Sequence, residues 1–395
     1  MNDQNLDKHA SLHPETLAIR IQQKRGEREH SVPLYMTSSF VFDDAEQARA
    51  MFADEIQGNI YTRFSNPNVN EFIEKLTVLE LAEDGIGTAS GMSAVFTGMA
   101  ALLKSGDHIV AARSVFGSTH QILVKILPKW GITHTYIDGS TREDWENAIQ
   151  PNTKMFFLET PSNPGLQVYD LEMIGKVANE RGIILNVDNC FATPIIQQPM
   201  KYGAHLVTHS ATKFIDGQGR AIGGAVLGRK DLIKELRFFA RQTGPAMSPF
   251  NAWIFSKSLE TLSIRMKRHS ESAFWLAQEL SKLSEVETVR YPFLESHPQH
   301  ELAKKQMAMG GGVVCFTING GQEKATQLID KLQLISITAN LGDSRTIITH
   351  PASTTHSKLS TLEREAVGIS DNLVRVSVGL EHPTDILNDI QQALS

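Results

Sequence analysis

The feature that most limits the fold of this chain is the regular alternation of short apolar runs with longer amphipathic segments between residues 91 and 228. The apolar runs, which predict strands, are HIVAAR, THTYID, TKMFFLET, GIILNVDN, AHLVTHS and GGAVLG. Among them, GMSAVFTGMAALLKSG, HQILVKILPKWG and LEMIGKVANERG predict helices, and the last two end in a glycine suited to a helix C-cap. Strands that alternate with helices are joined by crossovers. We therefore expect an α/β fold with a mostly parallel sheet and helices on both faces.

The segments on either side of this region have different patterns. Residues 1–60 show no sustained period beyond a helix-like segment at 14–23 and the apolar run SVPLYMTSSFVF, which indicates an arm that packs on another surface. Helical spacing then begins with Phe72, Ile73, Leu76, Leu79 and Glu83. From residue 251 a long helical stretch precedes the strand candidates GGGVVCFTI, LISITANLG and LVRVSVGLE. We predict an arm at 1–60, a main domain at 61–255 and a smaller α+β domain at 256–395.

Length, charge and cysteine content narrow the functional classes. A chain of 395 residues exceeds one ordinary hydrophobic core, and 41% hydrophobic with 21% charged residues is typical of soluble globular proteins. The net charge of −6 argues against nucleic acid or an anionic membrane as the main partner. Cys190 and Cys315 have no metal-binding spacing and exclude a disulfide framework. Because the N-terminus lacks the apolar part of a signal peptide and no apolar run reaches membrane-spanning length, we expect a cytoplasmic protein.

One stretch, THSATKFIDGQGRAIGG at 208–224, fits two different chemistries. Ser210 and Lys213 have the S-x-x-K spacing of serine acyl-transfer enzymes, whereas a lysine after an apolar run suits a Schiff base with an aldehyde cofactor. A serine enzyme of that class also needs S-D-N and K-T-G elements. Here S-D-N at 370–372 follows the T-G pair at 243–244, and the lysine of K-T-G is missing. The order of these elements argues against a serine nucleophile.

Two other motifs lack the context that their chemistry needs. The stretch from Gly85 is one residue short of G-x-G-x-x-G, follows a predicted helix and has no acidic residue closing a second strand. His205 and His209 have a spacing that would suit a metal on a helix, but their segment predicts a strand and contains no acidic residue. We interpret the two histidines as core residues or neighbours of a site.

The polar residues that remain match the needs of pyridoxal 5′-phosphate. This cofactor requires an amine for a Schiff base, a carboxylate that keeps its pyridine nitrogen protonated, and N–H and hydroxyl donors for its phosphate. Asp188 ends the run GIILNVD, and Lys213 follows the next predicted strand. The carboxyl ends of parallel strands share one edge of the sheet, where ligands bind in open α/β folds. A helix N-cap remains an alternative role for Asp188.

Candidates for the phosphate site come from two segments. Ser210 and Thr212 alternate with an alanine, so both hydroxyls can face one anion. Ser90, Gly91 and Met92 open a predicted helix, and small residues there leave backbone N–H groups free for a phosphate. An ordinary helix cap explains this segment equally well.

Nearly end to end, the chain resembles the Cys/Met-metabolism enzymes that depend on pyridoxal phosphate, which include cystathionine γ-synthase, cystathionine β-lyase, methionine γ-lyase and the homoserine-ester sulfhydrylases. The matching stretches are YTRFSNPN, ASGMSA, ETPSNP, VDNCFATP, HSATKFIDG, LGDSRTIITHPASTTH and VRVSVGLE. The resemblance implies fold type I (aspartate-aminotransferase-like), with a mostly parallel seven-stranded sheet, helices on both faces and a smaller α+β C-terminal domain. Residues 61–255 would then be the pyridoxal-phosphate-binding domain.

The resemblance also implies roles for individual residues around the cofactor. Lys213 would form the Schiff base, Asp188 would pair with the pyridine nitrogen, and Asn163 would lie near the 3′ oxygen. Phe116 stands where most members stack a tyrosine on the cofactor ring, so stacking is kept while the acid–base role of a phenol is lost. The residues implied to hold the phosphate are Ser90, Gly91, Met92, Ser210 and Thr212.

Other implied roles concern the substrate and a neighbouring subunit. Arg375 matches the arginine that binds the substrate α-carboxylate, a bidentate task suited to a guanidinium. Tyr61 and Arg63 match the Y-x-R that reaches the phosphate from the neighbouring subunit, and Tyr61 is also a candidate acid or base beside the substrate. The resemblance therefore implies dimers that share active sites, paired into the homotetramer usual in the family.

Departures from the family pattern narrow the choice among the branches of the family. Asn340 stands where many lyases have serine and is a candidate substrate-binding residue, while GQGR at 217–220 and TGPAMSPFNAW at 243–253 are similar to enzymes that act on O-succinylhomoserine with a small thiol or sulfide. We expect a γ-replacement that gives homocysteine and succinate in methionine biosynthesis. Cystathionine γ-synthase, an O-acetylhomoserine sulfhydrylase and a methionine or cystathionine γ-lyase remain alternatives. For Arg220, a structural ion pair is favoured over a contact with the succinyl carboxylate.

Overall fold

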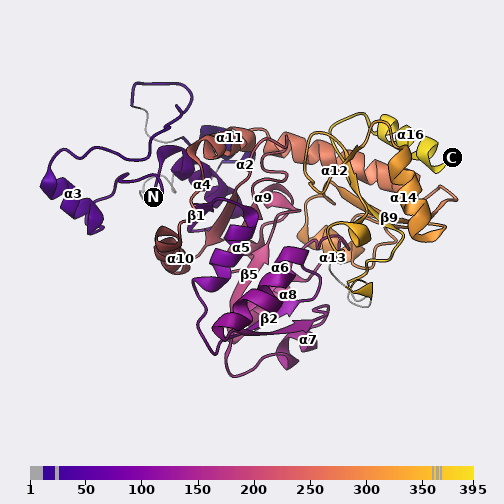
Figure 1. The fold of residues 1–395 in the computed structure, drawn as a ribbon, viewed down its shortest axis with the longest axis horizontal. Helices are drawn as coiled ribbons and strands as arrows, with labels where there is room; N and C mark the ends of the chain where they lie inside the picture. Colours follow the sequence, from indigo (N-terminus) through magenta and orange to yellow (C-terminus); the bar gives the residue numbers. More distant parts are fainter. Residues whose placement is uncertain (1–11, 23–25, 358–359, 362–363, 365–366) are drawn as a thin grey trace.

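Two β-sheets organise the protein, one of seven strands and one of five. The computed structural model describes residues 12–22, 26–357, 360–361, 364 and 367–395. In Figure 1 the long helix α12 (Leu262–Leu280) runs across the molecule from the side of α11 (Pro249–Leu259) toward α16 (Pro383–Leu394). It thereby connects the parts of the molecule that contain the two sheets.

The seven-stranded sheet confirms the predicted α/β architecture. Across the sheet the order is β1-β7-β6-β5-β4-β2-β3; strands β3, β2, β4, β5 and β6 run parallel, and β7 is antiparallel to both neighbours. Every strand predicted between residues 108 and 228 is present. In chain order the strands are β1 (Asp84–Thr88), β2 (His108–Ala112), β3 (Thr133–Ile137), β4 (Thr153–Glu159), β5 (Ile184–Asp188), β6 (Leu206–Ser210) and β7 (Gly224–Gly228).

Both faces of this sheet are buried, which explains why its strands are continuous apolar runs in the sequence. Along β4, Phe156 and Leu158 belong to a core cluster with Ile174 of α8, whereas Phe157 belongs to a second cluster with Val95 of α5. The helices that accompany the sheet are α4 (Pro67–Glu80), α5 (Gly91–Ala100), α6 (Gly117–Gln121), α7 (Arg142–Asn147), α8 (Leu171–Glu180), α9 (Thr193–Ile196) and α10 (Lys230–Thr243).

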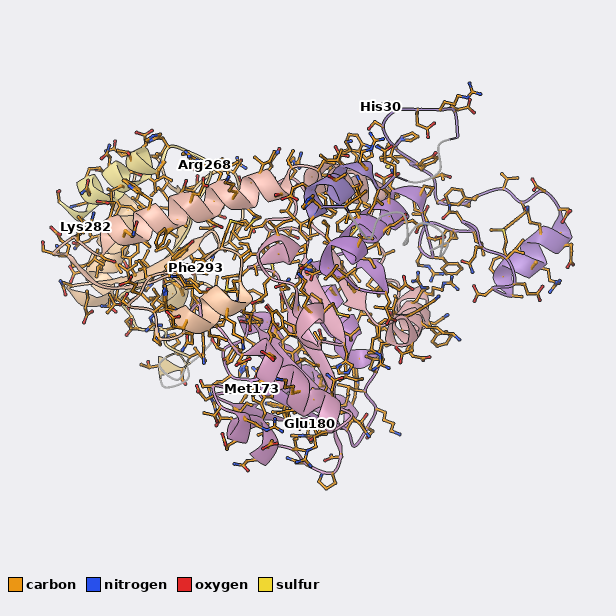
Figure 2. The ribbon with its side chains drawn as sticks, turned by 180° about the vertical axis from the view of Figure 1, so that it is seen from behind. His30, Met173, Glu180, Arg268, Lys282 and Phe293 are labelled. Carbon is orange, nitrogen blue, oxygen red and sulfur yellow. The ribbon has the colours of Figure 1, made fainter. Side chains whose placement is uncertain are left out.

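The five-stranded sheet forms a separate core near the C-terminus, with the order β10-β11-β12-β9-β8. Its strands are β8 (Val286–Arg290), β9 (Val313–Ile318), β10 (Ser336–Ile337), β11 (Ile347–Thr349) and β12 (Leu373–Ser377), with helices α13 (His300–Gln306) and α14 (Gly321–Lys331). Figure 2 shows α12 from behind, with Arg268 on the helix and Lys282 just beyond its end. The domain boundary proposed at residue 255 falls within α11, between the two sheets, and stays a prediction.

Some elements differ from the sequence-based expectation. Strand β1 was not predicted because Gly85 and Gly87 give it little β-forming character. A Cβ on Gly85 would lie 2.5 Å from Leu227 Cδ2, so the Leu227 side chain would have to shift to admit a larger residue. Strands β8 and β11 were also not predicted. Helix α4 ends before Glu83, at Leu81 in the left-handed conformation with φ 60°.

The helical stretch predicted from residue 251 is two helices rather than one. Helix α11 ends at Leu259, and α12 begins at Leu262 after a break at residues 260–261. Within the described residues, no helix has the length and apolar character needed to cross a bilayer.

The N-terminal region contains one docked helix and one projecting segment. Helix α2 (Pro14–Arg20) packs on α4 through its buried residues Leu17 and Ala18. The segment that carries α3 (Ala45–Phe52) extends away from the body in Figure 1. It leaves apolar side chains in solvent, with Val41 99% and Phe52 63% exposed. An arm that contacts a neighbouring subunit remains a prediction for this segment.

The close approach of α8 to the turn at Pro199–Tyr202 yields a test of the fold. A Cβ on Gly175 would lie 1.9 Å from the carbonyl oxygen of Tyr202, a backbone atom that has little freedom to move. We expect Gly175→Ala to lower the free energy of unfolding by about 1–3 kcal/mol, measured by urea denaturation. Gly26→Ala is the matched control, since a Cβ on Gly26 would have nothing within 4 Å. Equal urea midpoints of unfolding for the two variants would contradict the close packing of Gly175 on Tyr202.

Candidate active site

The candidate site lies where β5 and β6 end at the same edge of the seven-stranded sheet. Asp188 is the last residue of β5, and Lys213 lies shortly after the end of β6; the two strands are paired and parallel. Strand β12 and the loop before β11, both from the second sheet region, bring Arg375 and Asn340 to this edge. The structure therefore brings together residues that are far apart in the sequence.

Lys213 is held by an amide from the other sheet region. Its Nζ donates to Asn340 Oδ1 at 2.7 Å. Burial lowers the pKa of Lys213, and the positive charge of Arg375 lowers it further, against an opposing influence of Cys190. A lowered pKa increases the fraction of free amine near neutral pH, which suits both nucleophilic attack and proton abstraction.

Arg375 is a buried cation, and no carboxylate of the described residues forms an ion pair with it. It is 1% exposed; its Nη1 donates to Asn163 Oδ1 at 2.9 Å and its Nη2 to the backbone oxygen of Asn340 at 3.1 Å. Its Nε–H has no hydrogen-bond partner among the described residues. Burial lowers the pKa of Arg375 to about 10, so the group remains charged at neutral pH. An uncompensated buried charge is costly, so this position favours a carboxylate ligand.

Asp188 has the opposite charge type, and it forms no ion pair with any basic side chain in the part of the chain that the structure describes. Its Oδ1 accepts a hydrogen bond from Cys190 N at 3.0 Å. Burial raises the pKa of Asp188 to about 6, while His209 acts in the opposite direction. The helix that follows, α9, is preceded by Ala192, so Asp188 caps no helix there. A cation that approaches this carboxyl would compensate for its burial, as a protonated pyridine nitrogen would.

The N-terminus of α5 faces Ser210 closely. Ser90 caps the helix, since Ser93 N donates to Ser90 Oγ at 3.1 Å, so the helix-cap interpretation is confirmed for that residue. The N–H groups of Gly91 and Met92 have no partner among the described residues, as expected in the first helical turn. A Cβ on Gly91 would lie 2.6 Å from Ser210 Oγ, so only glycine permits this approach. The arrangement fits an anion held between the helix terminus and the serine.

Thr212 has a different environment from Ser210. Its hydroxyl donates to Gly223 O at 3.3 Å and accepts from Gly223 N at 3.1 Å. Because a hydroxyl has only one hydrogen to donate, Thr212 would have to release Gly223 O in order to donate to a phosphate.

Phe116 is anchored by a residue that sequence reasoning missed. Its backbone N–H donates to Glu159 Oε1 at 2.6 Å, and its half-buried ring stacks on no other aromatic ring of the described structure. Glu159 is 6% exposed and lies directly opposite Asp188 in the β4–β5 register. The sequence contains only a partial signal: TKMFFLE ends in a carboxylate as GIILNVD does, but the strand register and the contact with Phe116 are visible only in the structure.

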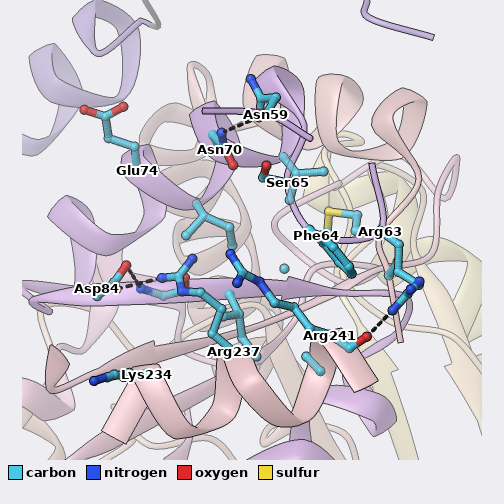
Figure 3. A pocket seen from close by; sticks show the side chains of 18 of the residues that line it. Asn59, Arg63, Phe64, Ser65, Asn70, Glu74, Asp84, Lys234, Arg237 and Arg241 are labelled. Atoms are coloured by element: carbon cyan, nitrogen blue, oxygen red, sulfur yellow. Dashed lines mark hydrogen bonds and ion pairs between the residues drawn. The ribbon is translucent and has the colours of Figure 1, made fainter. Parts of the chain in front are cut away.

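Tyr61 and Arg63 are not brought to this edge within the chain. Tyr61 forms an isolated bridge with Ser39 and is 40% exposed, and Arg63 donates to the backbone oxygen of Arg241. Figure 3 shows Arg63 and Arg241 at a cavity of about 1140 Å³ between α4, β1 and α10. Neither Lys213 nor Asp188 lines that cavity.

The remaining polar candidates have structural partners. Arg220 forms an ion pair with Asp216 at 2.9 Å and donates to Ser258 Oγ at 2.5 Å, so the expected ion pair is present. His209 Nε2 lies 2.6 Å from Glu80 Oε1, and both side chains are buried. No group of metal-binding side chains is found within the described residues.

Comparisons with known proteins agree with this arrangement. A family model for Cys/Met metabolism PLP-dependent enzymes matches residues 15–395. O-succinylhomoserine sulfhydrylase of Pseudomonas aeruginosa is 49% identical over 382 residues, covering 96% of this chain and 95% of that protein. L-methionine gamma-lyase of Fusobacterium nucleatum is 42% identical over 367 residues, covering 92% of this chain and 93% of that protein. The crystal structure of a candidate O-acetylhomoserine (thiol)-lyase from Campylobacter jejuni contains N′-pyridoxyl-lysine-5′-monophosphate; it has a TM-score of 0.94 and 34% identity, and covers 97% of this chain and 100% of that chain.

The lowered pKa of Lys213 predicts where an aldehyde will react. We expect that one equivalent of pyridoxal phosphate, followed by borohydride reduction near neutral pH, modifies Lys213 in preference to exposed lysines. Peptide mass spectrometry would locate the adduct. Lys213→Ala should abolish it, whereas the control Lys154→Ala, at an exposed position, should not. A main adduct on any other lysine would contradict the assignment.

Proposed function

The chain belongs to the Cys/Met-metabolism family of pyridoxal-phosphate-dependent enzymes, and within that family we propose that it converts O-succinylhomoserine and sulfide to homocysteine and succinate. The observation that supports an amino-acid substrate is the buried Arg375, which has no anionic partner among the described residues. Asn340 links it to the amine of Lys213. The relative that supports the finer assignment is the 49% identical O-succinylhomoserine sulfhydrylase. This reaction is a γ-replacement and would serve methionine biosynthesis.

The residues of the site fit the cofactor of the family. When bound, pyridoxal phosphate supplies an electron sink that stabilises negative charge next to the substrate amine. We propose that Lys213 holds it covalently and that Asp188 faces its ring nitrogen, where the carboxyl lacks a cation within the described structure. Asn163 would donate to the 3′ oxygen through its amide N–H, since its Oδ1 already accepts from Arg375. The proposed phosphate ligands are Ser90, Gly91, Met92, Ser210 and Thr212.

Lys213 is the proposed base and proton carrier of the reaction. Its amine, with a lowered pKa, would take the proton from the substrate Cα and return protons at neighbouring carbons as succinate leaves and sulfide adds. Asn340 binds Nζ through its side chain and Arg375 through its backbone oxygen. One residue therefore sets the distance between the base and the carboxylate anchor, which favours a single reactive orientation.

Phe116, the residue proposed to stack on the cofactor, cannot act as an acid or base. Its ring can cover one face of the cofactor but has no group that exchanges protons. We propose that Tyr61 of a neighbouring subunit supplies the helper acid or base, with Arg63 beside it at the phosphate. Within one chain, the guanidinium of Arg63 lies 5.4 Å from the centre of the Tyr61 ring, so the two side chains would be delivered together.

This arrangement requires an assembly. We propose dimers that share active sites and that pair into a homotetramer. The projecting segment before Tyr61 supports the proposal, because its exposed apolar side chains, such as Val41 and Phe52, would be buried by a second copy. We further propose a cytoplasmic location, in keeping with the free thiols of Cys190 and Cys315.

The substrate assignment is tested with a matrix of assays on the holoenzyme. O-succinylhomoserine and O-acetylhomoserine are each combined with sulfide or cysteine, and L-methionine is tested alone. We expect the highest kcat/KM for O-succinylhomoserine with sulfide. Faster reaction with cysteine at equal concentration would identify a cystathionine γ-synthase instead. Preferential cleavage of methionine would identify a γ-lyase, the activity of the 42% identical relative.

The role of Arg375 makes a second prediction. Arg375→Lys removes the bidentate contact from a buried site, so we expect KM for O-succinylhomoserine to rise by roughly 30- to 1000-fold, corresponding to about 2–4 kcal/mol. The change in kcat should be smaller, and cofactor binding should persist. Steady-state kinetics and absorption spectra provide the measurements.

The control for this prediction is Arg220→Lys, an arginine paired with Asp216. We expect its KM for O-succinylhomoserine to stay close to that of the wild type. A rise in KM for O-succinylhomoserine without a rise in KM for O-acetylhomoserine would instead place Arg220 at the distal carboxylate of the succinyl group. An unchanged KM in Arg375→Lys would contradict the proposed carboxylate anchor.

A further inference from the structure

Two carboxyl groups end adjacent strands beside the proposed cofactor site. Glu159 is the last residue of β4, Asp188 is the last residue of β5, and the parallel register pairs them directly. Adjacent strands lie about 4.8 Å apart, and paired residues point to the same face. Glu159 is 6% exposed, so water cannot separate the two charges effectively. Two ionised carboxylates in this position would repel each other strongly.

The groups around Glu159 do not supply a compensating charge. Its Oε1 accepts from Phe116 N at 2.6 Å, and no lysine, arginine or histidine of the described residues forms an ion pair with it. Tyr169 and Cys190 are the other titratable groups that respond to Glu159, and burial raises the pKa of each, which keeps them neutral at physiological pH. Burial and the charge of Asp188 raise the pKa of Glu159 well above its ordinary value.

The basic side chains near this edge influence residues other than Glu159. His209 lowers the pKa of Asp188, and Lys213 lowers that of Cys190, on the far side of Asp188 from β4. A protonated pyridine nitrogen at Asp188 would add one positive charge to the site and would thus balance one carboxylate.

We propose that Glu159 is a positioning residue: an uncharged carboxyl that fixes Phe116 over the cofactor ring and leaves Asp188 as the single negative charge at the ring nitrogen. This inference rests on the cofactor placement proposed above. It assigns Glu159 no contact with the substrate.

The backbone around Phe116 explains why an anchor is needed. Phe116 occupies the N-cap position of α6, and no side chain caps that helix. On one side the Phe116 N–H is held by Glu159; on the other, a Cβ on Gly117 would lie 3.1 Å from the backbone oxygen of Thr355. The backbone that carries the Phe116 ring is therefore held at its N–H by Glu159. A neutral carboxyl retains the acceptor oxygen that one of these contacts requires.

Two variants distinguish the effect of the acceptor oxygen of Glu159 from the effect of its charge. Glu159→Gln retains a carbonyl oxygen and has no charge, so we expect the affinity of the full-length apoenzyme for pyridoxal phosphate to stay within about threefold of wild type. Glu159→Ala leaves the Phe116 N–H without an acceptor in a buried place, so we expect roughly a tenfold or greater loss of affinity. Titration followed by absorption and fluorescence gives both values.

The pH dependence of stability provides a readout that a purely structural role would not change. A carboxyl whose pKa is higher in the folded than in the unfolded state loses stabilisation as pH rises from the unfolded value, about 4.3, through the folded value. Asp188, with a pKa of about 6, contributes this slope mainly below pH 6. We measure the free energy of unfolding of the apoenzyme by urea denaturation at fixed protein concentration. Between pH 6 and pH 8 we expect this free energy to decline less in Glu159→Gln than in the wild type.

Asp216→Asn is the matched control, because Asp216 is a buried carboxylate that has a cationic partner in Arg220. It should lower the urea midpoint at pH 8, whereas Glu159→Gln should raise it relative to wild type. Parallel pH profiles for wild type and Glu159→Gln, or an equal loss of cofactor affinity in Gln and Ala variants, would overturn the proposal. If Glu159→Ala fails to fold, the pH profile of the stability of Glu159→Gln still tests the proposal. Failure of wild type to bind the cofactor would instead refute the proposed function.

Discussion

The guanidinium of Arg265 fixes the turn that presents Lys213, and the geometry of the whole site depends on it. From α12, Arg265 donates to the backbone oxygens of Phe214 at 2.6 Å and Ile215 at 3.1 Å, and to that of Ser258 at 2.9 Å. A Cβ on Gly217 would lie 1.9 Å from Arg265 Nη1, so glycine is required where the turn meets the arginine. A helix that packs on the second sheet thus holds the lysine that follows a strand of the first.

The loop that carries Asn340 closes on the same turn from the other side. A Cβ on Gly342 would lie 2.4 Å from the backbone nitrogen of Phe214, and Gly342 has φ 75°, so only glycine fits comfortably. Arg345 pairs with Asp343 and donates to Gln218 O at 3.1 Å. The GQGR segment, whose sequence favoured one branch of the family, therefore contacts the loop of Asn340 through Gln218.

Sequence reasoning succeeded where one physical rule determines position. Asp188 and Lys213 follow neighbouring parallel strands, so their meeting at one edge was predictable. Strand β1 was missed because its two glycines disfavour a strand in the sequence, whereas its pairing with β7 is visible only in the structure. Glu159 was missed for a related reason: its importance depends on a register partner and on a backbone N–H from a distant loop. The link from Asn340 to both Lys213 and Arg375 likewise needs three-dimensional information.

Each of the three central ionisable groups of the site lacks an oppositely charged partner within the described structure. Arg375 has no anion, Asp188 has no cation, and the Lys213 amine has only an amide oxygen as its hydrogen-bond partner within the described structure. Their removal from water has an energetic cost that folding has already met, through anchors such as the contact of Arg375 with Asn163. A ligand that brings a carboxylate, a protonated ring nitrogen and a carbonyl carbon would therefore gain strong interactions without further reorganisation of the protein. The same imbalance explains why Glu159 must be neutral, since a second free negative charge beside Asp188 would weaken the selection for a single ring cation.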